Sequence, residues 1–86
     1  MNFSPHERVD VVAIYRASSG EFLPTKVRWK NQEYRIIKLG YYHKVRVGNI
    51  LHHIFSVATE NVALRLNFDS ETLGWTLEEI ADGSNS

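Results

Sequence analysis

The sequence predicts an all-β protein: an antiparallel meander of five or six strands, either left open or closed into a small barrel. Two hairpin-like segments carry this prediction. Trp29 and Tyr34 flank one turn, Phe68 and Trp75 flank another, and apolar residues alternate with polar ones beside each turn. Such alternation is typical of strands with one buried and one wet face. No apolar pattern holds a 3.6-residue period long enough for a helix.

Length and composition indicate one domain, residues 1–86, held together by packing alone. A chain of 86 residues buries roughly 60% of its extended surface, which leaves no material for a second core. An apolar content of 43% suffices for a packed interior, and the absence of cysteine is typical of a reduced cytosolic protein. No apolar run approaches the ~20 residues that cross a bilayer, and residues 1–10 lack a signal-peptide core. We therefore expect a cytoplasmic protein.

The N-terminal part of the chain is expected to hold a loose end, a strand and a turn. Residues 1–8 contain Pro5 and few apolar side chains, so they are predicted as a loose lead-in. Residues 9–16 form the first strand, and their unbroken apolar run indicates that both faces are covered or that the strand lies centrally. A turn follows at 17–21. Pro24 cannot donate to a ladder and is expected at a strand start or edge.

A first hairpin is predicted around Asn31 and Gln32, which suit a two-residue loop. On its first strand one face carries Thr25, Val27 and Trp29, and the other carries Lys26, Arg28 and Lys30. The predicted loop opposes Trp29 with Tyr34, Val27 with Ile36, and Arg28 with Arg35. Aromatic and β-branched pairs stabilise the inner face by roughly 0.2 to 1 kcal/mol each, whereas two opposed arginines repel each other.

Two further hairpins follow from the apolar pairs that they create. Residues 50–59 and 62–68 are predicted as strands around a tight turn at Glu60 and Asn61, and a longer loop at 69–74 leads to the last strand. A slip of one residue would turn polar side chains inward, so this register is strongly specified. The predicted pairs are Phe55 with Leu66, Val57 with Leu64, Ser56 with Arg65, Phe68 with Trp75, Leu66 with Leu77, and Arg65 with Glu78.

Residues 39–49 are the least readable stretch, because Gly40 and Gly48 bracket a mixture of aromatic, basic and β-branched residues. The stretch forms a short strand or a long loop. In an alternative α+β arrangement, residues 41–49 or the N-terminus form a short helix against one face of the sheet. Residues 82–86 are predicted as a loose polar tail. The predicted interior consists of Val27, Trp29, Tyr34, Ile36, Phe55, Val57, Leu64, Leu66, Phe68, Trp75 and Leu77.

Charge is unevenly distributed, although the formal net charge is zero. The charged residues of 26–46 are all basic apart from Glu33. The charged residues of 60–86 are all acidic apart from Arg65. Either the two halves neutralise each other across a shared sheet, or the basic half faces an anionic partner. The predicted contacts of the opposed Arg28 and Arg35 are with Glu78, Glu79 or a bound anion.

No motif in the sequence predicts catalysis, a metal site or a cofactor. His52 and His53 are adjacent, but neighbours in a strand point to opposite faces and cannot share one ion. We expect His53 to pack near Phe68 and His52 to face solvent or a hydrogen-bond partner. No serine or carboxylate has a base at a spacing typical of a nucleophile or an acid–base pair. The chain is therefore interpreted as a non-enzymatic binding module without a cofactor or a metal.

Two classes of partner fit such a module. The first is a protein partner or a second copy, which would dock on an uncovered strand edge or on an apolar face at Val12 and Ile14. The alternative is nucleic acid or another polyanion bound by the basic residues from Lys26 to Arg46. No membrane contact is expected. The residues predicted to contribute to binding are Arg28, Arg35, Tyr41, Tyr42, Lys44 and Arg46.

Two motifs resemble those of small uncharacterised bacterial domains. Residues 27–30 and 34–36 fit a W-x-x-x-x-Y-x-[IV] hairpin, and residues 75–77 fit a terminal W-x-L strand. The resemblance covers about residues 24–80 and implies an all-β fold. Some of these families lie beside genes for DNA-repair polymerases, which implies a slight tilt towards nucleic acid. They have no established activity and assign no functional residues, and this chain departs from them by lacking the glycine of the first hairpin and by being less basic.

Overall fold

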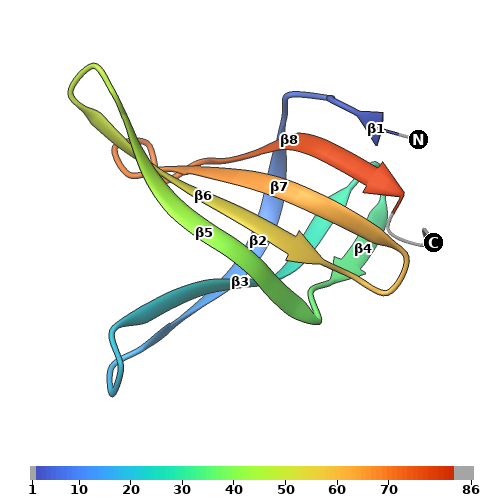
Figure 1. The fold of residues 1–86 in the computed structure, drawn as a ribbon, viewed down its shortest axis with the longest axis horizontal. Helices are drawn as coiled ribbons and strands as arrows, with labels where there is room; N and C mark the ends of the chain where they lie inside the picture. The colour runs from blue at the N-terminus through green and yellow to red at the C-terminus, as the bar shows by residue number, and fades with distance from the viewer. Residues whose placement is uncertain (1, 83–86) are drawn as a thin grey trace.

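The chain forms one antiparallel sheet, which the computed structural model describes for residues 2–82 (Figure 1). Within this range there are eight strands and no helix. The strands are β1 (Asn2–Phe3), β2 (Glu7–Arg16), β3 (Glu21–Trp29), β4 (Gln32–Arg35), β5 (Lys38–Val47), β6 (Ile50–Ala58), β7 (Val62–Asp69) and β8 (Trp75–Asp82). The predicted all-β antiparallel fold is confirmed, with more strands than the expected five or six. The described residues contain no helix long and apolar enough to cross a membrane.

Two meanders make up the sheet, and strand β2 joins them. The strand order is β4-β3-β2-β8-β7-β6-β5, with β1 also paired to β8. The start of β2, Glu7 to Val9, pairs with β8, and the remainder of β2 pairs with β3. The first and last long strands therefore lie side by side, and each meander extends from this pair.

Residues 2–3 and 7–8 belong to the sheet, which corrects the expectation of a loose lead-in over residues 1–8, of which Met1 lies outside the described residues. Asn2 and Phe3 pair with the end of β8. The Phe3 ring lies 6.3 Å from the Trp29 ring, and the Trp29 indole Nε1 donates a 2.6 Å hydrogen bond to Glu7 Oε1. These contacts with β3 and β8 hold the segment in place.

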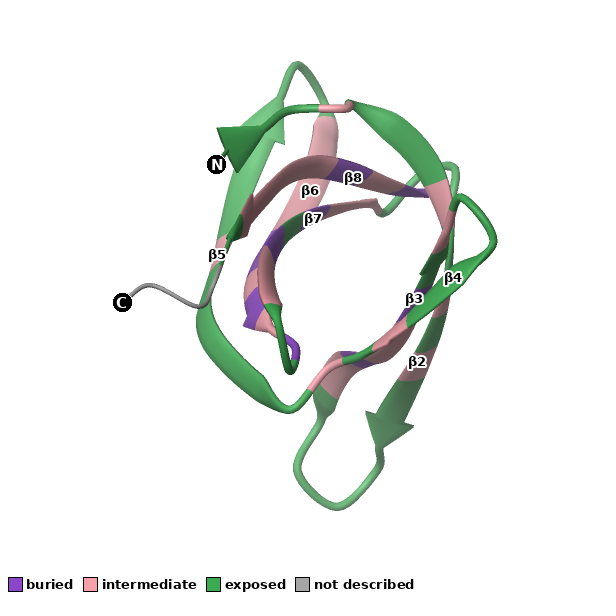
Figure 2. Ribbon diagram, turned by 90° about the vertical axis from the view of Figure 1, so that its right-hand side faces the viewer, coloured by how far each residue is buried: buried purple, intermediate pink, exposed green. Residues whose placement is uncertain are grey.

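The sheet coils on itself but does not close (Figure 2). Between β4 and β5 the chain turns a corner at Ile36 and Ile37, whose amides donate to Thr25 of β3 and to Ala58 of β6 respectively. In the described part of the chain, no Cα atom of β3 or β4 lies within 8 Å of a Cα atom of β5. Of the two predicted alternatives, the sheet is therefore the open one. We call the opening between β3 and β5 the seam.

The core lies on the inner face of this coiled sheet. Its buried members are Val27, Phe55, Val57, Leu64, Leu66, Trp75 and Leu77. The other predicted interior residues, Trp29, Tyr34, Ile36 and Phe68, pack against them while partly buried. The whole predicted interior is thus confirmed as one cluster. The predicted register of β6 with β7 is also confirmed, because Phe55 pairs with Leu66 and Val57 with Leu64.

Two irregularities in register turn additional apolar residues inward. Leu77 and Ile80 are three residues apart and would point to opposite faces of a regular strand. A shift between Arg65 and Leu66 pairs Leu66 with Leu77 but Leu64 with Ile80, so both β8 residues reach the core. A similar shift opposite Thr25 directs the buried Pro24 inward in place of the predicted Thr25. Pro24 therefore occupies a bulge within β3.

The first hairpin has a different register from the predicted one. Its loop is Lys30 and Asn31, whose φ angles of 52° and 61° are those of a type I′ turn. Val27 consequently pairs with Tyr34 instead of Ile36, and Trp29 pairs with Gln32 instead of Tyr34. Arg28 pairs with Glu33, so the predicted opposition of Arg28 and Arg35 does not occur. The observed register replaces a repulsive pair with an attractive one at this position.

The structure also describes residues 39–49, for which the sequence predicted either a strand or a loop, and the first residue of the predicted tail. Residues 39–49 form most of strand β5 and a tight turn, in which Gly48 adopts a φ of 63° that favours glycine. Of the predicted tail at 82–86, Asp82 ends β8 and residues 83–86 lie outside the described residues.

Candidate functional site

The six predicted binding residues are distributed over three surfaces. Arg28 and Arg35 lie on the outer face of β3 and β4, opposite the buried face that holds Val27. Tyr41 lies on the outer face of β5, where its Cα partner is Ser56. Tyr42, Lys44 and Arg46 lie on the inner face of β5, since their partners on β6 include Phe55 and His53. The structure therefore brings together three of the six.

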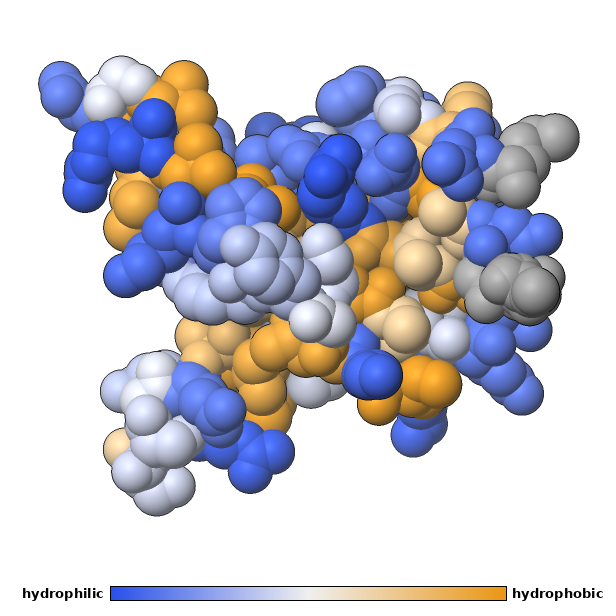
Figure 3. All heavy atoms as spheres, viewed as in Figure 1, coloured by the Kyte–Doolittle hydropathy of each residue, from blue (hydrophilic) through white to orange (hydrophobic). Residues whose placement is uncertain are grey.

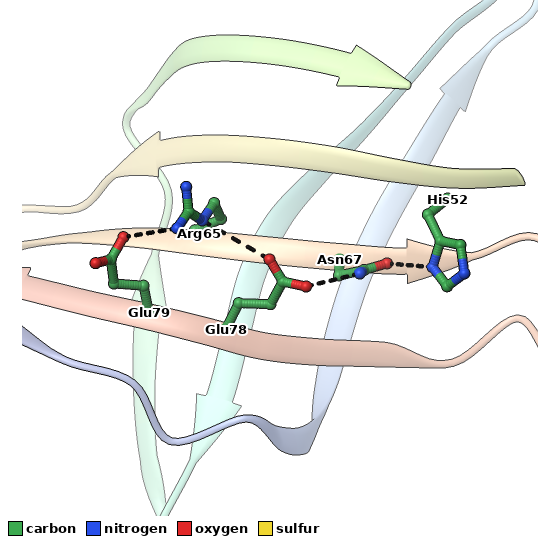
Figure 4. A network of polar contacts seen from close by, with 5 residues as sticks. All are labelled: His52, Arg65, Asn67, Glu78 and Glu79. Atoms are coloured by element: carbon green, nitrogen blue, oxygen red, sulfur yellow. Dashed lines mark hydrogen bonds and ion pairs between the residues drawn. The ribbon is translucent and has the colours of Figure 1, made fainter. Parts of the chain in front are cut away.

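The two predicted arginines do not contact the acidic residues of β8. Glu78 and Glu79 instead flank Arg65, whose guanidinium lies 3.7 Å from Glu78 Oε1 and 3.2 Å from Glu79 Oε1 (Figure 4). The predicted outer pair was Arg65 with Glu78, but the bulge makes Glu79 the Cα partner and keeps Glu78 within reach. No ion pair of Arg28 or Arg35 occurs among residues 2–82. The prediction that they contact Glu78 or Glu79 was wrong.

A polar network continues from Arg65 across the outer face of the sheet (Figure 4). Asn67 Nδ2 donates a 2.7 Å hydrogen bond to Glu78 Oε2, and Asn67 Oδ1 lies 2.9 Å from His52 Nδ1. These groups satisfy one another, which is the ordinary behaviour of side chains on a half-wet face. The described residues hold no group of three or more histidine or acidic side chains arranged to bind a metal.

The histidines of β6 point to opposite faces, as the sequence predicted. His52 faces outward to its Asn67 partner. His53 faces inward, with its ring 5.9 Å from the Phe68 ring. His53 Nδ1 lies 2.6 Å from the Tyr42 hydroxyl, and the two rings stack at an angle of 15°. Tyr42 and His53 thus form a pair at the opening of the interior.

This pair lines a cleft of about 380 Å³ between β3 and the strands β5 and β6. We call this cleft the mouth, and its lining includes Phe22, Leu39, Tyr42, His53 and Phe55. Burial lowers the pKa of the His53 imidazole, and the nearby positive charges of Lys44 and His52 lower it further. Burial also raises the pKa of the Tyr42 phenol. Both groups are therefore held in their neutral forms near pH 7, which suits an amphipathic surface with little charge of its own.

A second cleft of about 290 Å³ continues the seam towards the corner at Ile36 and Ile37. Leu23 and Leu39 line both this cleft and the mouth, so the two are neighbours. The mouth is lined by Phe22 from the inner face, whereas Ile14 and Arg16 of the second cleft lie on the outer face of β2. Apolar residues are also exposed on the β2–β3 and β5–β6 hairpins that project on either side of the seam (Figures 1 and 3). The seam is therefore an apolar groove between two hairpins.

Within residues 2–82, four cations lie along this groove, and one anionic residue, Glu21, lines the mouth. Lys38 and Arg16 line the second cleft, and Lys44 and Arg46 follow Tyr42 on the inner face of β5. Arg16 is partly neutralised by Glu21, at 3.9 Å. In the part of the chain that the structure describes, no ion pair involves Lys38, Lys44 or Arg46. The β5 wall of the seam is thus positively charged.

The sequence pattern did not predict the mouth, because the residues that line it come from separate strands. Phe22 contacts Phe55, Phe68 and Trp75 at ring distances of 6.4, 5.0 and 5.9 Å, although it belongs to the other meander. Leu39 and Tyr42 are three residues apart and share a face only because of a register shift at Gly40. The one available signal was that glycine, since an isolated glycine within a strand indicates a bulge.

Comparison with protein-family models, curated proteins and solved structures found no match to this chain. The resemblance to small bacterial domains therefore stays a prediction, and the geometry of the sheet has to carry the functional argument.

Proposed function

We propose that this chain is a small non-enzymatic module that binds a protein partner at strand β5. The observation that carries the proposal is the edge of this strand. β5 is ten residues long and pairs with β6 alone among the described strands. Unpaired backbone groups along such an edge favour addition of another strand.

The side chains of β5 support the same proposal. Its exposed large apolar residues are Leu39, Tyr41, Tyr42, Val45 and Val47. They occupy both faces of the strand, so a segment added to its edge would find apolar contacts above and below the backbone. Tyrosines are enriched among residues that dominate binding energy at interfaces. Tyr41, with 61% of its surface exposed, is the strongest such anchor on the outer face.

A different protein is a better partner for β5 than a second copy. Two β5 edges placed together would bring Lys38, Lys44 and Arg46 of each copy into one ladder without an acidic residue. Like charges across paired strands are destabilising. We therefore expect the chain to sediment as a monomer, and a concentration-dependent dimer that disappears on substitution of Tyr41 would favour self-association instead.

Polyanion binding is the weaker alternative, because the basic residues do not share one face. Arg28 and Arg35 lie on the outer face of β3 and β4, whereas Lys44 and Arg46 lie on the inner face of β5. A titration with single-stranded and duplex DNA at increasing salt separates the two functions. Affinity for a polyanion falls steeply with salt, and we expect no binding at physiological ionic strength.

The proposal is tested by selecting twelve-residue peptides from a random display library against the full chain. Enriched peptides should slow amide exchange in β5. The Tyr41→Lys variant should bind them at least about tenfold more weakly, which corresponds to about 1.4 kcal/mol. Tyr15→Lys is the matched control, because Tyr15 is also an exposed strand tyrosine, at 68%. Failure to enrich any peptide, or equal losses in both variants, would contradict the proposal.

A further inference from the structure

The seam is wider than the spacing between two paired strands. Paired strands lie 4.7–4.9 Å apart, so a strand paired on both sides separates its neighbours by about 9.5 Å. In the described residues, every Cα of β3 is more than 8 Å from every Cα of β5. The two walls are therefore too far apart to pair with each other, and the clefts of about 290 and 380 Å³ between them are lined from both β3 and β5.

Both walls present unpaired backbone to this space. β5 pairs with β6 only, and Phe22 and Leu23 of β3 pair with β2 but with no strand on the side of the seam among residues 2–82. The next residue, Pro24, has no N–H to offer. Pairing on the β3 wall is thus limited to a short stretch, whereas the β5 wall offers a longer ladder.

The floor of the seam selects apolar side chains. An extended segment directs every second side chain to one face. In this position the side chains of one face would enter the mouth beside Phe22 and Phe55, and those of the other face would lie against the second cleft beside Ile14 and Leu23. The segment would cover apolar surface that is otherwise exposed, and burial of such surface favours association.

The charges beside the seam select acidic residues. Lys44 and Arg46 lie two and four residues beyond Tyr42 on the same face, and Lys38 lies at the opposite end of the β5 wall. None of the three has an ion-pair partner within the described part of the chain. Charge complementarity therefore favours a segment that carries Asp or Glu beside its apolar residues.

We infer that the seam accepts an extended, acidic and apolar segment of a partner protein, which adds to the β5 edge and fills the groove against β3. This inference rests on the proposed function and names its partner by chemistry. The segment places apolar side chains in the two clefts and carboxylates beside Lys44 and Arg46. It completes the sheet by occupying the position where the chain itself supplies no strand.

The peptides enriched by the display selection described above test this inference. Their consensus should place Asp or Glu two or four residues from an apolar residue, so that both lie on the face that meets Tyr42, Lys44 and Arg46. Binding should slow amide exchange in β5 and shift the NMR signals of Phe22 and Leu23. The double variant Lys44→Glu with Arg46→Glu should weaken binding at least about tenfold. The matched control is Lys26→Glu with Arg28→Glu, which reverses two cations on the outer face of β3 and should change affinity less than about twofold.

The outcomes separate this inference from the proposed function. Peptides that bind β5 without acidic residues, or that leave Phe22 and Leu23 unchanged, would overturn the inference and leave protein binding in place. Absence of any enriched peptide would overturn both. A peptide whose Glu or Asp residues are changed to Lys should lose affinity for the unmodified chain, which tests charge without altering the protein. Displacement of the peptide by a twelve-nucleotide single strand at physiological salt would overturn the inference in favour of a polyanion.

Discussion

Strands β6, β7 and β8 form one region of the sheet, and the seam between β3 and β5 forms another with opposite properties. Each of the three strands is paired on both sides, and two of their inner side chains, Leu66 and Leu77, have no exposed surface. At the seam each wall has an unpaired side, and Leu39 keeps 41% of its surface exposed. The difference teaches that the residues holding the fold are separate from those offered for binding. A rigid paired region can therefore support an open one.

The largest expected effect comes from truncating a leucine to alanine in the paired region, compared with the same substitution at the seam. Leu66→Ala removes a side chain with no exposed surface and should lower the free energy of unfolding by about 2–5 kcal/mol, since it leaves a cavity. Leu39→Ala should lower it by less than about 1 kcal/mol, because solvent replaces the lost side chain. Urea denaturation of both variants measures the difference. Similar losses at the two positions would show that the seam is part of the stabilising core.

The register of the paired region could be predicted because its side chains permit only one register. A slip of one residue between β6 and β7 would place Arg65 inside, and the observed pairs, Phe55 with Leu66 and Val57 with Leu64, are the predicted ones. At β8 the prediction departed by one residue, because alternation cannot place Leu77 and Ile80 on the same face without a bulge. Buried apolar pairs thus fix a register from the sequence, and bulges are where that rule stops.

The β3–β4 hairpin beside the seam was mispredicted for a different reason. A slip of two residues keeps every side chain on its own face, so Val27 faces the core whether it pairs with Ile36 or Tyr34. The apolar pattern cannot distinguish these registers. The turn decides between them, and the backbone places Lys30 and Asn31, rather than Asn31 and Gln32, at positive φ.

Glycine substitutions in the loop test this register, and their expected effect on the free energy of unfolding is intermediate in size. The double variant Lys30→Asn with Asn31→Gly supplies the preferred type I′ sequence and should raise the free energy of unfolding by about 0.5 to 1 kcal/mol. Gln32→Gly is the informative counterpart. It should destabilise the chain, since Gln32 is a strand residue paired with Trp29, whereas the sequence-predicted loop would make it stabilising. Thermal or urea unfolding gives the signs, and a stabilising Gln32→Gly would restore the predicted register.

The candidate site was less predictable than the core, because proximity across the seam is a property of the whole coiled sheet. Tyr42, Lys44 and Arg46 were identified from their position in an irregular basic stretch, and they do share a face. Phe22 and Leu39, which complete the mouth, carried no local mark of function. Arg28 and Arg35 were selected from a register that does not form, and they lie on another surface.

The smallest expected effect concerns His53, where the two regions meet. Its folded-state pKa lies below the ordinary value of about 6.5, first because burial disfavours the imidazolium and then because Lys44 and His52 repel it. Well above pH 6.5 the imidazole is neutral in both states and contributes no pH dependence. Below it the unfolded chain binds the proton more readily, so the free energy of unfolding falls with pH until His53 protonates in the folded state as well.

The His53→Gln variant should remove this part of the acid sensitivity. Urea denaturation at several pH values between 7.5 and 5 measures the slope for the variant and for the unmodified chain. The difference in slope between the variant and the unmodified chain should be modest, because the imidazole lies at the mouth and remains partly exposed. His6→Asn is the matched control: it removes a histidine that does not line the mouth, at a position with a φ of 51° that asparagine tolerates. If His53→Gln and the unmodified chain lose stability equally between pH 6.5 and 5, the mouth does not hold His53 neutral. In that case its aromatic lining is open to water, and the apolar floor inferred for the seam would not extend to this end of β5.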